Sequence, residues 1–162
     1  MGIDPGTATT GYGIVEAYGQ ELRSLVSGVI RTSPDQTLPA RLHDIHRQIR
    51  RLAREWQPDE AAVEELFFSR NVRTAMNVGQ ARGVAILALA DAGLSIAEYT
   101  PLSIKQAVTG YGSADKTQMQ EMVRLLLGLS EVPRPDDAAD ALAVAICHLH
   151  SARLRKLSEL AR

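Results

Sequence analysis

The order of strand-like and helix-like segments is the feature that most constrains the fold of this chain. Residues 2–4, 11–16 and 25–30 have strand patterns, and glycine- or proline-containing turns separate them. From residue 38 onward, helical and strand patterns alternate. A run of strands followed by strands that alternate with helices predicts an α/β fold whose sheet has mixed strand directions.

Residues 38–56 predict an amphipathic helix. The apolar side chains recur at steps of four and three and therefore fall on one stripe: Leu38, Leu42, Ile45, Ile49, Leu52 and Trp56. Most of the arginines in this segment lie off the stripe, and Pro58 ends the helix. The pattern therefore indicates one apolar face and one basic face.

The rest of the chain continues the alternation. Residues 61–67 form a short apolar run that Glu64 and Glu65 interrupt, which is typical of a buried strand, and residues 95–99 predict another strand. A helix follows that is marked by Met119, Met122, Leu126 and Leu129, and a last helix begins at about residue 136.

Residues 74–92 predict a helix that is apolar on nearly every side. Gly79 and Gly83 stand four residues apart within it. A helix that is apolar all round has to be covered all round. In a chain of this size we expect the helix to form a subunit interface.

Composition and charge narrow the class of protein. The 162 residues fit one domain, expected to span residues 1–162 with a basic tail at about 151–162. No apolar run approaches the ~20 residues of a membrane span, and no leader is apparent, so we expect a cytoplasmic protein without a membrane partner. The single cysteine, Cys147, excludes an internal disulfide.

The net charge of −1 hides a separation of charges along the chain. Basic residues gather at 41–54 and 151–162, whereas acidic residues gather at 59–65 and 135–140. Such a chain can bind phosphate and metal at different places, so the net charge neither supports nor excludes a nucleic-acid partner.

Four acidic positions stand out by where they fall. Asp4 ends the first strand, and Glu64 or Glu65 interrupts the apolar strand. Asp137 and Asp140 are three residues apart at the start of the last helix, which places them on one face. A carboxylate in a hydrophobic strand loses hydration and needs a compensating partner.

If the acid-bearing strands are neighbours, opposite side chains stand only ~5 Å apart at Cβ. Two carboxylates ~4 Å apart repel by about 4 kcal/mol at an effective dielectric of 20, so converging acids require cations. Ligand sets made only of oxygen favour Mg²⁺ or Mn²⁺. Two such ions ~4 Å apart would activate a water and stabilise the leaving oxygen in phosphodiester cleavage.

Each acid also has a structural interpretation. Asp4 can cap the turn that follows it, Glu64 can pair with an arginine, and Asp136 and Asp137 can cap the last helix. The spacing alone leaves open whether the acids meet. It also leaves open the choice between Glu64 and Glu65 and between Asp136 and Asp137.

Four sequence blocks, in order over nearly the whole chain, share the pattern of one known family. They comprise residues 2–6 with 10–13; residues 63–67 with Asn71, Ala75 and 79–83; Lys105, Gln106, Gly110, Gly112, Ala114 and Lys116; and residues 137–143 with Ala145 and His148. These blocks resemble the RuvC family of Holliday-junction resolvases. Four blocks in order are far more specific than any one motif.

The resemblance implies a ribonuclease-H-like fold, with a mixed five-stranded sheet flanked by helices on both faces. It implies a homodimeric, Mg²⁺-dependent crossover junction endodeoxyribonuclease that resolves four-way DNA junctions by symmetric paired nicks. Two ions per active site are expected, with Mn²⁺ as a substitute. The RuvA–RuvB branch-migration complex is the further partner that the resemblance implies.

Carried over by position, the catalytic and metal-binding acids are Asp4, Glu64, Asp137 and Asp140. Glu64 is preferred because the family's glutamate stands three residues before a phenylalanine, here Phe67. Asp137 is preferred because the family has an acid, two alanines and an aspartate in that order.

The resemblance also implies DNA-binding residues: Phe67, Phe68, Arg70, Arg73, Lys105 and Lys116. Phe67 matches an aromatic residue that the family places at the junction, and the two lysines match basic residues at the scissile phosphate. An exposed ring at Phe67 would stack on an unpaired base. His148 and His150 are expected to pack the helix rather than to bind metal.

Three other functions compete with this interpretation. An actin-like ATPase or sugar kinase has a phosphate loop similar to residues 4–7, but that architecture needs two such domains, and no second copy of the loop is present. A non-catalytic junction-binding scaffold would be expected to lose one of the four acids, and all four are present. A generic ribonuclease-H-like nuclease on another nucleic acid is the runner-up, because the same four acids serve many substrates.

Overall fold

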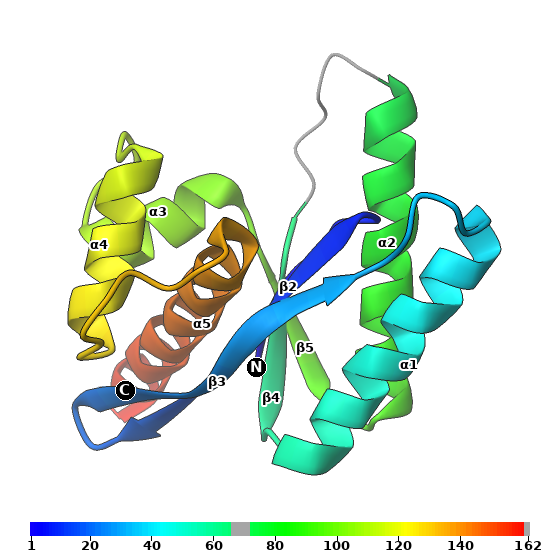
Figure 1. Cartoon of the computed structure of the whole chain (residues 1–162). Helices are drawn as coiled ribbons and strands as arrows, with labels where there is room; N and C mark the ends of the chain where they lie inside the picture. The colour runs from blue at the N-terminus through cyan, green and yellow to red at the C-terminus, as the bar shows by residue number, and fades with distance from the viewer. Residues whose placement is uncertain (66–71, 161–162) are drawn as a thin grey trace.

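The computed structural model describes residues 1–65 and 72–160, and side chains at residues 1–65 and 75–154 (Figure 1). Within these ranges the strands are β1 (Gly2–Asp4), β2 (Thr9–Tyr18), β3 (Glu21–Arg31), β4 (Glu60–Glu64) and β5 (Ser95–Tyr99). The helices are α1 (Leu38–Trp56), α2 (Val72–Asp91), α3 (Pro101–Thr109), α4 (Lys116–Leu126) and α5 (Asp136–Leu160).

The five strands form one mixed sheet in the order β3-β2-β1-β4-β5. β1, β2 and β3 follow one another directly along the chain and pair antiparallel. β4 lies parallel to β1 on one side and parallel to β5 on the other. The central strand β1 therefore joins an antiparallel half of the sheet to a parallel half, as the order of segments predicts.

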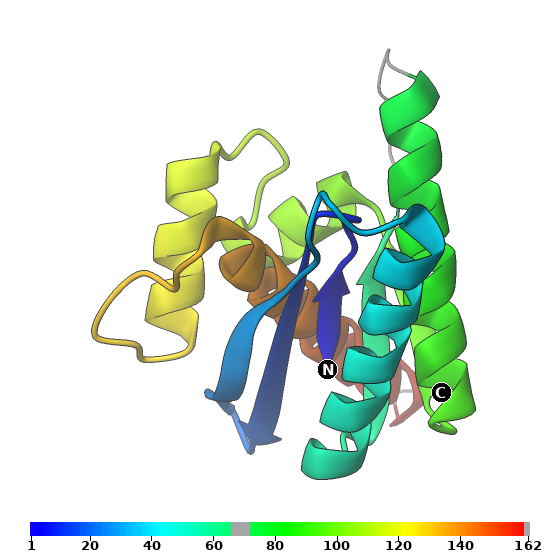
Figure 2. The same ribbon diagram turned by 45° about the vertical axis from the view of Figure 1, so that its right-hand side comes forward.

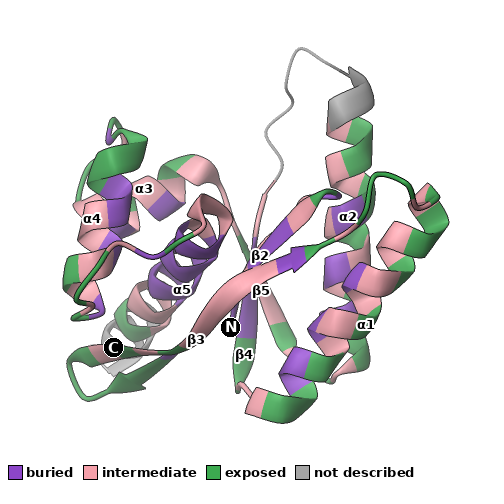
Figure 3. Cartoon of the chain, viewed as in Figure 1, coloured by how far each residue is buried: buried purple, intermediate pink, exposed green. Residues whose placement is uncertain are grey.

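Helices cover both faces of the sheet, which confirms the predicted architecture (Figures 1 and 2). α5 lies across one face, with α3 and α4 packed on its outer side, and α1 and α2 lie side by side on the other face. Each face has its own apolar core, and α5 is the most deeply buried helix of its layer (Figure 3).

The stripe predicted on α1 is confirmed. Ile45, Ile49 and Leu52 are buried in the core between α1, α2 and the sheet, whereas Arg47 and Arg51 are exposed. One apolar stripe and one basic face are typical of a helix that packs on a sheet with its other side in water.

Helix α3 is an element that the sequence patterns did not predict. Thr100 caps it by accepting a hydrogen bond from the Ser103 amide, and Pro101 stands at its first turn. Only Ile104 and Val108 of its nine residues are buried, so its hydrophobic pattern is short. Proline at the start of a helix is favourable because the missing amide proton would have no helical partner.

Two other expectations differ in detail. β4 ends at Glu64, whereas the apolar run predicted a strand to residue 67, and residues 66 and 67 lie outside the described part of the chain. α2 buries one face against α1 and the sheet, but Met76 and Leu87 remain 62% and 54% exposed. The open face of this helix is thus uncovered in the single chain.

Among the described residues, no helix combines the length and the apolar character needed to cross a membrane.

Candidate active site

The parallel pairing of β1 with β4 brings the first two acids together. Ile3 is the register partner of Val63, so one further step places Asp4 beside Glu64. Neighbouring strands lie about 4.8 Å apart, and both of these strands end at their acid. The sheet therefore holds two carboxyl groups at the same edge.

Glu64, not Glu65, faces the α5 layer. Side chains alternate between the faces of a strand, and Ala62 packs in the core under α5, whereas Val63 packs in the opposite core. Glu64 therefore points to the same side as Ala62, towards the helix that carries the remaining acids. The amide of Glu65 donates to the Tyr99 carbonyl at 2.8 Å and continues the pairing with β5.

Helix α5 approaches the strands through glycine. A Cβ atom on Gly11 would lie 1.9 Å from the Asp137 carbonyl oxygen, and one on Gly2 would lie 2.2 Å from the Ala141 carbonyl oxygen. Only residues without a side chain permit this backbone contact. The contact brings the first turns of α5, with Asp137 and Asp140, next to Asp4.

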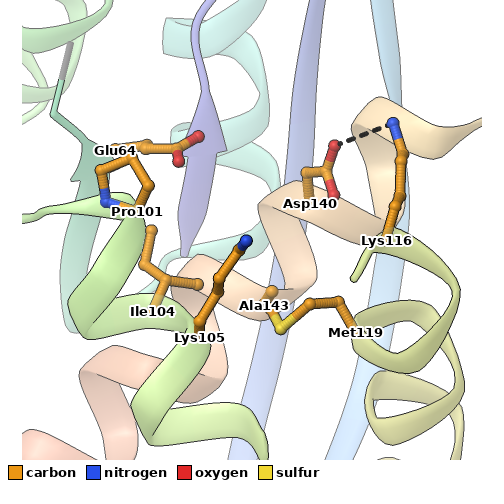
Figure 4. A pocket seen from close by; sticks show the side chains of 8 residues that line it. All are labelled: Glu64, Pro101, Ile104, Lys105, Lys116, Met119, Asp140 and Ala143. Carbon is orange, nitrogen blue, oxygen red and sulfur yellow. Dashed lines mark ion pairs between the residues drawn. The ribbon is translucent and has the colours of Figure 1, made fainter. Parts of the chain in front are cut away.

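A cleft of about 230 Å³ opens between the strand ends, α3, α4 and α5 (Figure 4). Its lining residues are Glu64, Pro101, Ile104, Lys105, Lys116, Met119, Asp140 and Ala143. The carboxyl groups of Glu64 and Asp140 lie across the cleft from one another, and both lysine side chains reach into the same space. The cleft thus combines acidic and basic side chains with an apolar lining.

Burial and mutual repulsion raise the pKa values of Asp4, Glu64 and Asp140. The pKa of Asp4 is raised to about 8, first by burial and then by the charges of Glu64, Asp140 and Asp137. Burial and the charge of Asp140 raise the pKa of Glu64, and a hydrogen bond joins the Asp4 and Glu64 carboxyls. Burial likewise raises the pKa of Asp140. The arrangement concentrates negative charge where water is scarce.

Lys116 partly offsets this charge. Its Nζ lies 3.1 Å from an Asp136 carboxylate oxygen and 3.6 Å from an Asp140 carboxylate oxygen. Asp136 also accepts hydrogen bonds from Gln120 and Arg134, and its pKa is lowered, first by the hydrogen bond from Lys116. Asp136 therefore holds Lys116 in place through an ion pair, a role that the sequence patterns did not predict.

The donor chemistry of the site fits a hard divalent cation. Asp4, Glu64, Asp137 and Asp140 supply only oxygen, the ligand type that Mg²⁺ and Mn²⁺ prefer. Among the residues that the structure describes, no three Asp, Glu, His or Cys side chains already stand in the arrangement of a metal site. The Asp140 carboxylate instead pairs with Lys116 at 3.6 Å.

Helix α2 supports the acidic strand ends from the opposite side. Arg82 Nε donates to the Glu64 carbonyl oxygen at 3.1 Å, and the guanidinium group also pairs with the Glu98 carboxylate. The Thr7 hydroxyl donates to the Asn77 carbonyl oxygen at 2.7 Å. The sequence analysis missed Arg82, although a charged residue in a helix that is apolar on nearly every side was a signal that it has a specific partner.

The two histidines of α5 lie in packing positions. His148 is buried, with Nε2 2.6 Å from a Glu60 carboxylate oxygen and Nδ1 3.0 Å from the Tyr99 hydroxyl. His150 Nδ1 lies 3.0 Å from the Ala107 carbonyl oxygen. Glu60 is at the end of β4 opposite to Glu64, so these contacts agree with the packing role expected of both histidines.

The predicted DNA-binding residues divide into two groups. Lys105 and Lys116 line the cleft. Phe67, Phe68 and Arg70 lie outside the described residues, as does the side chain of Arg73. For those four the assignment remains a prediction from the sequence.

Comparison with known proteins identifies the family. The family model described as crossover junction endodeoxyribonuclease RuvC matches residues 1–148. The protein of that name from Chloroflexus aggregans is 60% identical over 152 residues, which cover 94% of this chain and 93% of that protein. The one from Syntrophomonas wolfei is 53% identical over 159 residues, covering 98% and 92%.

Solved structures give the same result. Thermus thermophilus RuvC in complex with a Holliday junction substrate is 40% identical, with a TM-score of 0.90 over 94% of this chain and 93% of that one. The yeast mitochondrial Holliday junction resolvase Ydc2 is 14% identical, with a TM-score of 0.69 over 98% and 82%, and shares the fold. Because the family model matches most of its length, the chain belongs to the crossover junction endodeoxyribonuclease RuvC family.

Proposed function

We propose that this protein is a structure-selective endodeoxyribonuclease that resolves four-way DNA junctions by symmetric paired nicks. The observation that carries the proposal is that Glu64 and Asp140 line one cleft with Lys105 and Lys116, with Asp4 buried close to both acids, in a chain of the RuvC family. Buried acids with raised pKa values in a cleft are typical of a catalytic site.

In this proposal Asp4, Glu64, Asp137 and Asp140 bind Mg²⁺, two ions per site, with Mn²⁺ as a substitute. When bound, such ions supply an activated water and a counter-charge for the leaving oxygen. Family membership supports the use of a divalent metal, and the all-oxygen donor set supports a hard ion. The protein contributes the orientation of the four carboxylates and their shielding from bulk water.

Lys105 and Lys116 bind the scissile phosphodiester. Both line the cleft that Glu64 and Asp140 line, so a phosphate in the cleft would lie near two ammonium groups as well as near the two carboxylates. Asp136 is the nearer partner of Lys116, so it would hold this lysine at the cleft if Asp140 were to bind a cation. Phe67, with Phe68, Arg70 and Arg73 beside it, contacts the junction centre in this proposal, on the basis of the sequence resemblance.

A second copy of the chain covers the open face of α2. One exposed stripe of α2 carries Met76, Gly83 and Leu87, which are spaced seven and four residues apart. Among the residues that the structure describes, nothing lies within 4 Å of the position that a Cβ on Gly83 would take. A junction has two equivalent scissile phosphates, and a two-fold dimer presents one active site to each.

We further propose that residues 1–162 form one domain, that the protein acts in the cytoplasm, and that the RuvA–RuvB complex is its partner.

Cleavage of a synthetic four-way junction, beside a linear duplex and an RNA–DNA hybrid of the same sequence, tests the proposal. We expect symmetric nicks in the junction with Mg²⁺ and none with EDTA. Preferential cutting of the hybrid would instead identify a generic nuclease. Junction binding without any cutting would identify a scaffold.

A further inference from the structure

The end of β4 lacks one hydrogen bond of the parallel ladder. In a parallel pair, each residue whose main chain faces the neighbour bonds to the residues before and after its register partner. Ala62 follows this rule, since its amide donates to the Met1 carbonyl while Gly2 is its register partner. Glu64, two residues later, faces β1 in the same way. Its carbonyl oxygen should accept from the amide of residue 5.

Residue 5 is proline, which has no amide proton. The ladder therefore cannot satisfy the Glu64 carbonyl, although this is the residue whose carboxylate forms the cleft. Arg82 takes the place of the missing donor, because its Nε lies 3.1 Å from the Glu64 carbonyl oxygen. The Glu98 carboxylate on β5 pairs with the same guanidinium group and holds it there.

The second acid-bearing strand end is tied to the same helix. The chain turns after Asp4, and the buried Thr7 in this turn donates its hydroxyl proton to the Asn77 carbonyl oxygen in α2 at 2.7 Å. Asn77 and Arg82 are five residues apart on α2. One helix thus supports the main chain beneath both acids from the face opposite to the cleft.

We propose that Arg82 is a positioning residue for cleavage: it replaces the donor that Pro5 lacks and so fixes the Glu64 main chain, and with it the carboxylate. The inference rests on the proposed function, because it takes Glu64 to be a metal ligand. Arg82 lies on the far side of the sheet from the cleft and acts only through Glu64.

The test compares Arg82→Met, which keeps the aliphatic stem but removes every donor, with the wild-type protein. We expect its Mn²⁺ affinity, measured by electron paramagnetic resonance of the free ion, and its single-turnover cleavage rate with Mg²⁺ to fall by roughly 10–100-fold, as for other groups that orient a metal ligand. Junction affinity in EDTA should stay unchanged. Wild-type Mn²⁺ affinity and cleavage in the folded variant would overturn the proposal.

Arg50→Met is the matched control, since Arg50 on α1 pairs at 3.9 Å with the carboxylate of Asp91, the last residue of α2. We expect it to retain wild-type Mn²⁺ affinity and rate. Equal losses in both variants would mean that any weakening of α2 has this effect, which would overturn a specific role for Arg82.

Two more variants separate the hydrogen bond from the charge. Arg82→Lys keeps a cation for Glu98, but its single nitrogen cannot occupy both the Nε and the terminal guanidinium positions, and we expect it to remain impaired. A fully active lysine variant would overturn the argument that the Nε position is needed. It also serves if Arg82→Met does not fold. Arg82→Met combined with Pro5→Ala regains an amide opposite the Glu64 carbonyl, so we expect partial recovery. No recovery, with Pro5→Ala alone fully active, would also overturn the proposal.

The Mn²⁺ measurement keeps this inference distinct from the proposed function. If the wild-type protein binds Mn²⁺ but does not cut junctions, the proposed function fails. The effect of Arg82 on Mn²⁺ affinity is then still measured, and it supports or overturns the positioning role by itself.

Discussion

At the scale of single residues, Asp4 has the strongest conflict between its charge and its surroundings. Its carboxyl is buried beside Glu64, Asp140 and Asp137, and its pKa is raised to about 8. A group of this kind is stable as the neutral acid or opposite a cation, and unstable as a free carboxylate. The cost of the charged form appears directly in the pH dependence of folding.

We expect the metal-free protein to lose stability through Asp4 as the pH rises from about 4 to about 8. In that range the unfolded chain releases the Asp4 proton while the folded chain retains it, and each unit of pKa difference corresponds to about 1.4 kcal/mol. Asp4→Asn removes this loss, so at pH 8 in EDTA the variant should melt higher, by about 2–4 °C for each kcal/mol. Melting curves of both proteins between pH 5 and pH 9 check this; parallel curves would contradict it.

The adjacent pair Glu64 and Glu65 gives a second test at this scale. Glu64→Gln should abolish junction cutting while binding persists, because Glu64 lines the cleft and Glu65 does not. Glu65→Gln should cut at the wild-type rate. Gel assays of cutting and binding by the two variants decide the matter, and the reverse result would show that the strand faces were assigned wrongly.

At the scale of elements, the position of α5 depends on the absence of two side chains. Gly2 and Gly11 allow its main chain to rest on β1 and β2, and this contact sets the place of Asp137 and Asp140. Overpacking at such a contact is costly because neither main chain can move aside without moving its element. The glycines therefore contribute to the geometry of the site without touching a ligand.

Gly11→Ala should remove cleavage and lower stability by roughly 1–3 kcal/mol, the usual cost of overpacking. The added methyl group would lie 1.9 Å from the Asp137 carbonyl oxygen and must displace α5. Gly28→Ala is the matched control, since the three atoms nearest to its methyl group all belong to the end of the Tyr12 side chain rather than to a main chain. Urea unfolding and junction cleavage measure both effects; an active, stable Gly11→Ala protein would disprove the role given to this contact.

The sequence predicted some elements well and others poorly, for identifiable reasons. The α1 stripe and the strand at residues 95–99 were predicted because their periodicity is long or their ends are clear. α3 was missed because only Ile104 and Val108 mark its buried face, although Thr100 and Pro101 are typical of a helix start.

The candidate site was predictable in part. Asp4 and the α5 acids stand at element ends that the sequence indicates, and the family resemblance selected Glu64 over Glu65. Strand register and the place of α2 behind the sheet are not visible in a local pattern. The roles of Arg82 and Asp136 depend on both kinds of long-range contact, so the sequence alone did not reveal them.

At the scale of the whole molecule, the open face of α2 is the feature that a second copy would change. Leu87 is 54% exposed on the stripe with Met76 and Gly83. Stripes of small and apolar residues permit close packing of two helices, and apolar area removed from water stabilises the contact by about 25 cal/mol per Å². The supports of Asp4 and Glu64 attach to this same helix.

Leu87→Glu should convert a dimer into a monomer and abolish paired nicking, because two carboxylates would face one another across the two-fold axis. Leu125→Glu places the same charge at a residue of α4 that is 55% exposed, and should leave the dimer intact. Sedimentation at micromolar concentration checks both. A wild-type protein that sediments as a monomer and still makes paired nicks would exclude the dimer model.

The contribution of α5 to the site also has a consequence for protein synthesis. Asp4 leaves the ribosome more than a hundred residues before Asp137 and Asp140. Chains grow at about 5–20 residues per second and fold from the N-terminal side. For several seconds a nascent chain therefore carries the first half of the proposed site without the second, and a product of interrupted translation that lacks α5 lacks half of the acids. We therefore expect the proposed site to be complete only in molecules that have been translated through the start of α5.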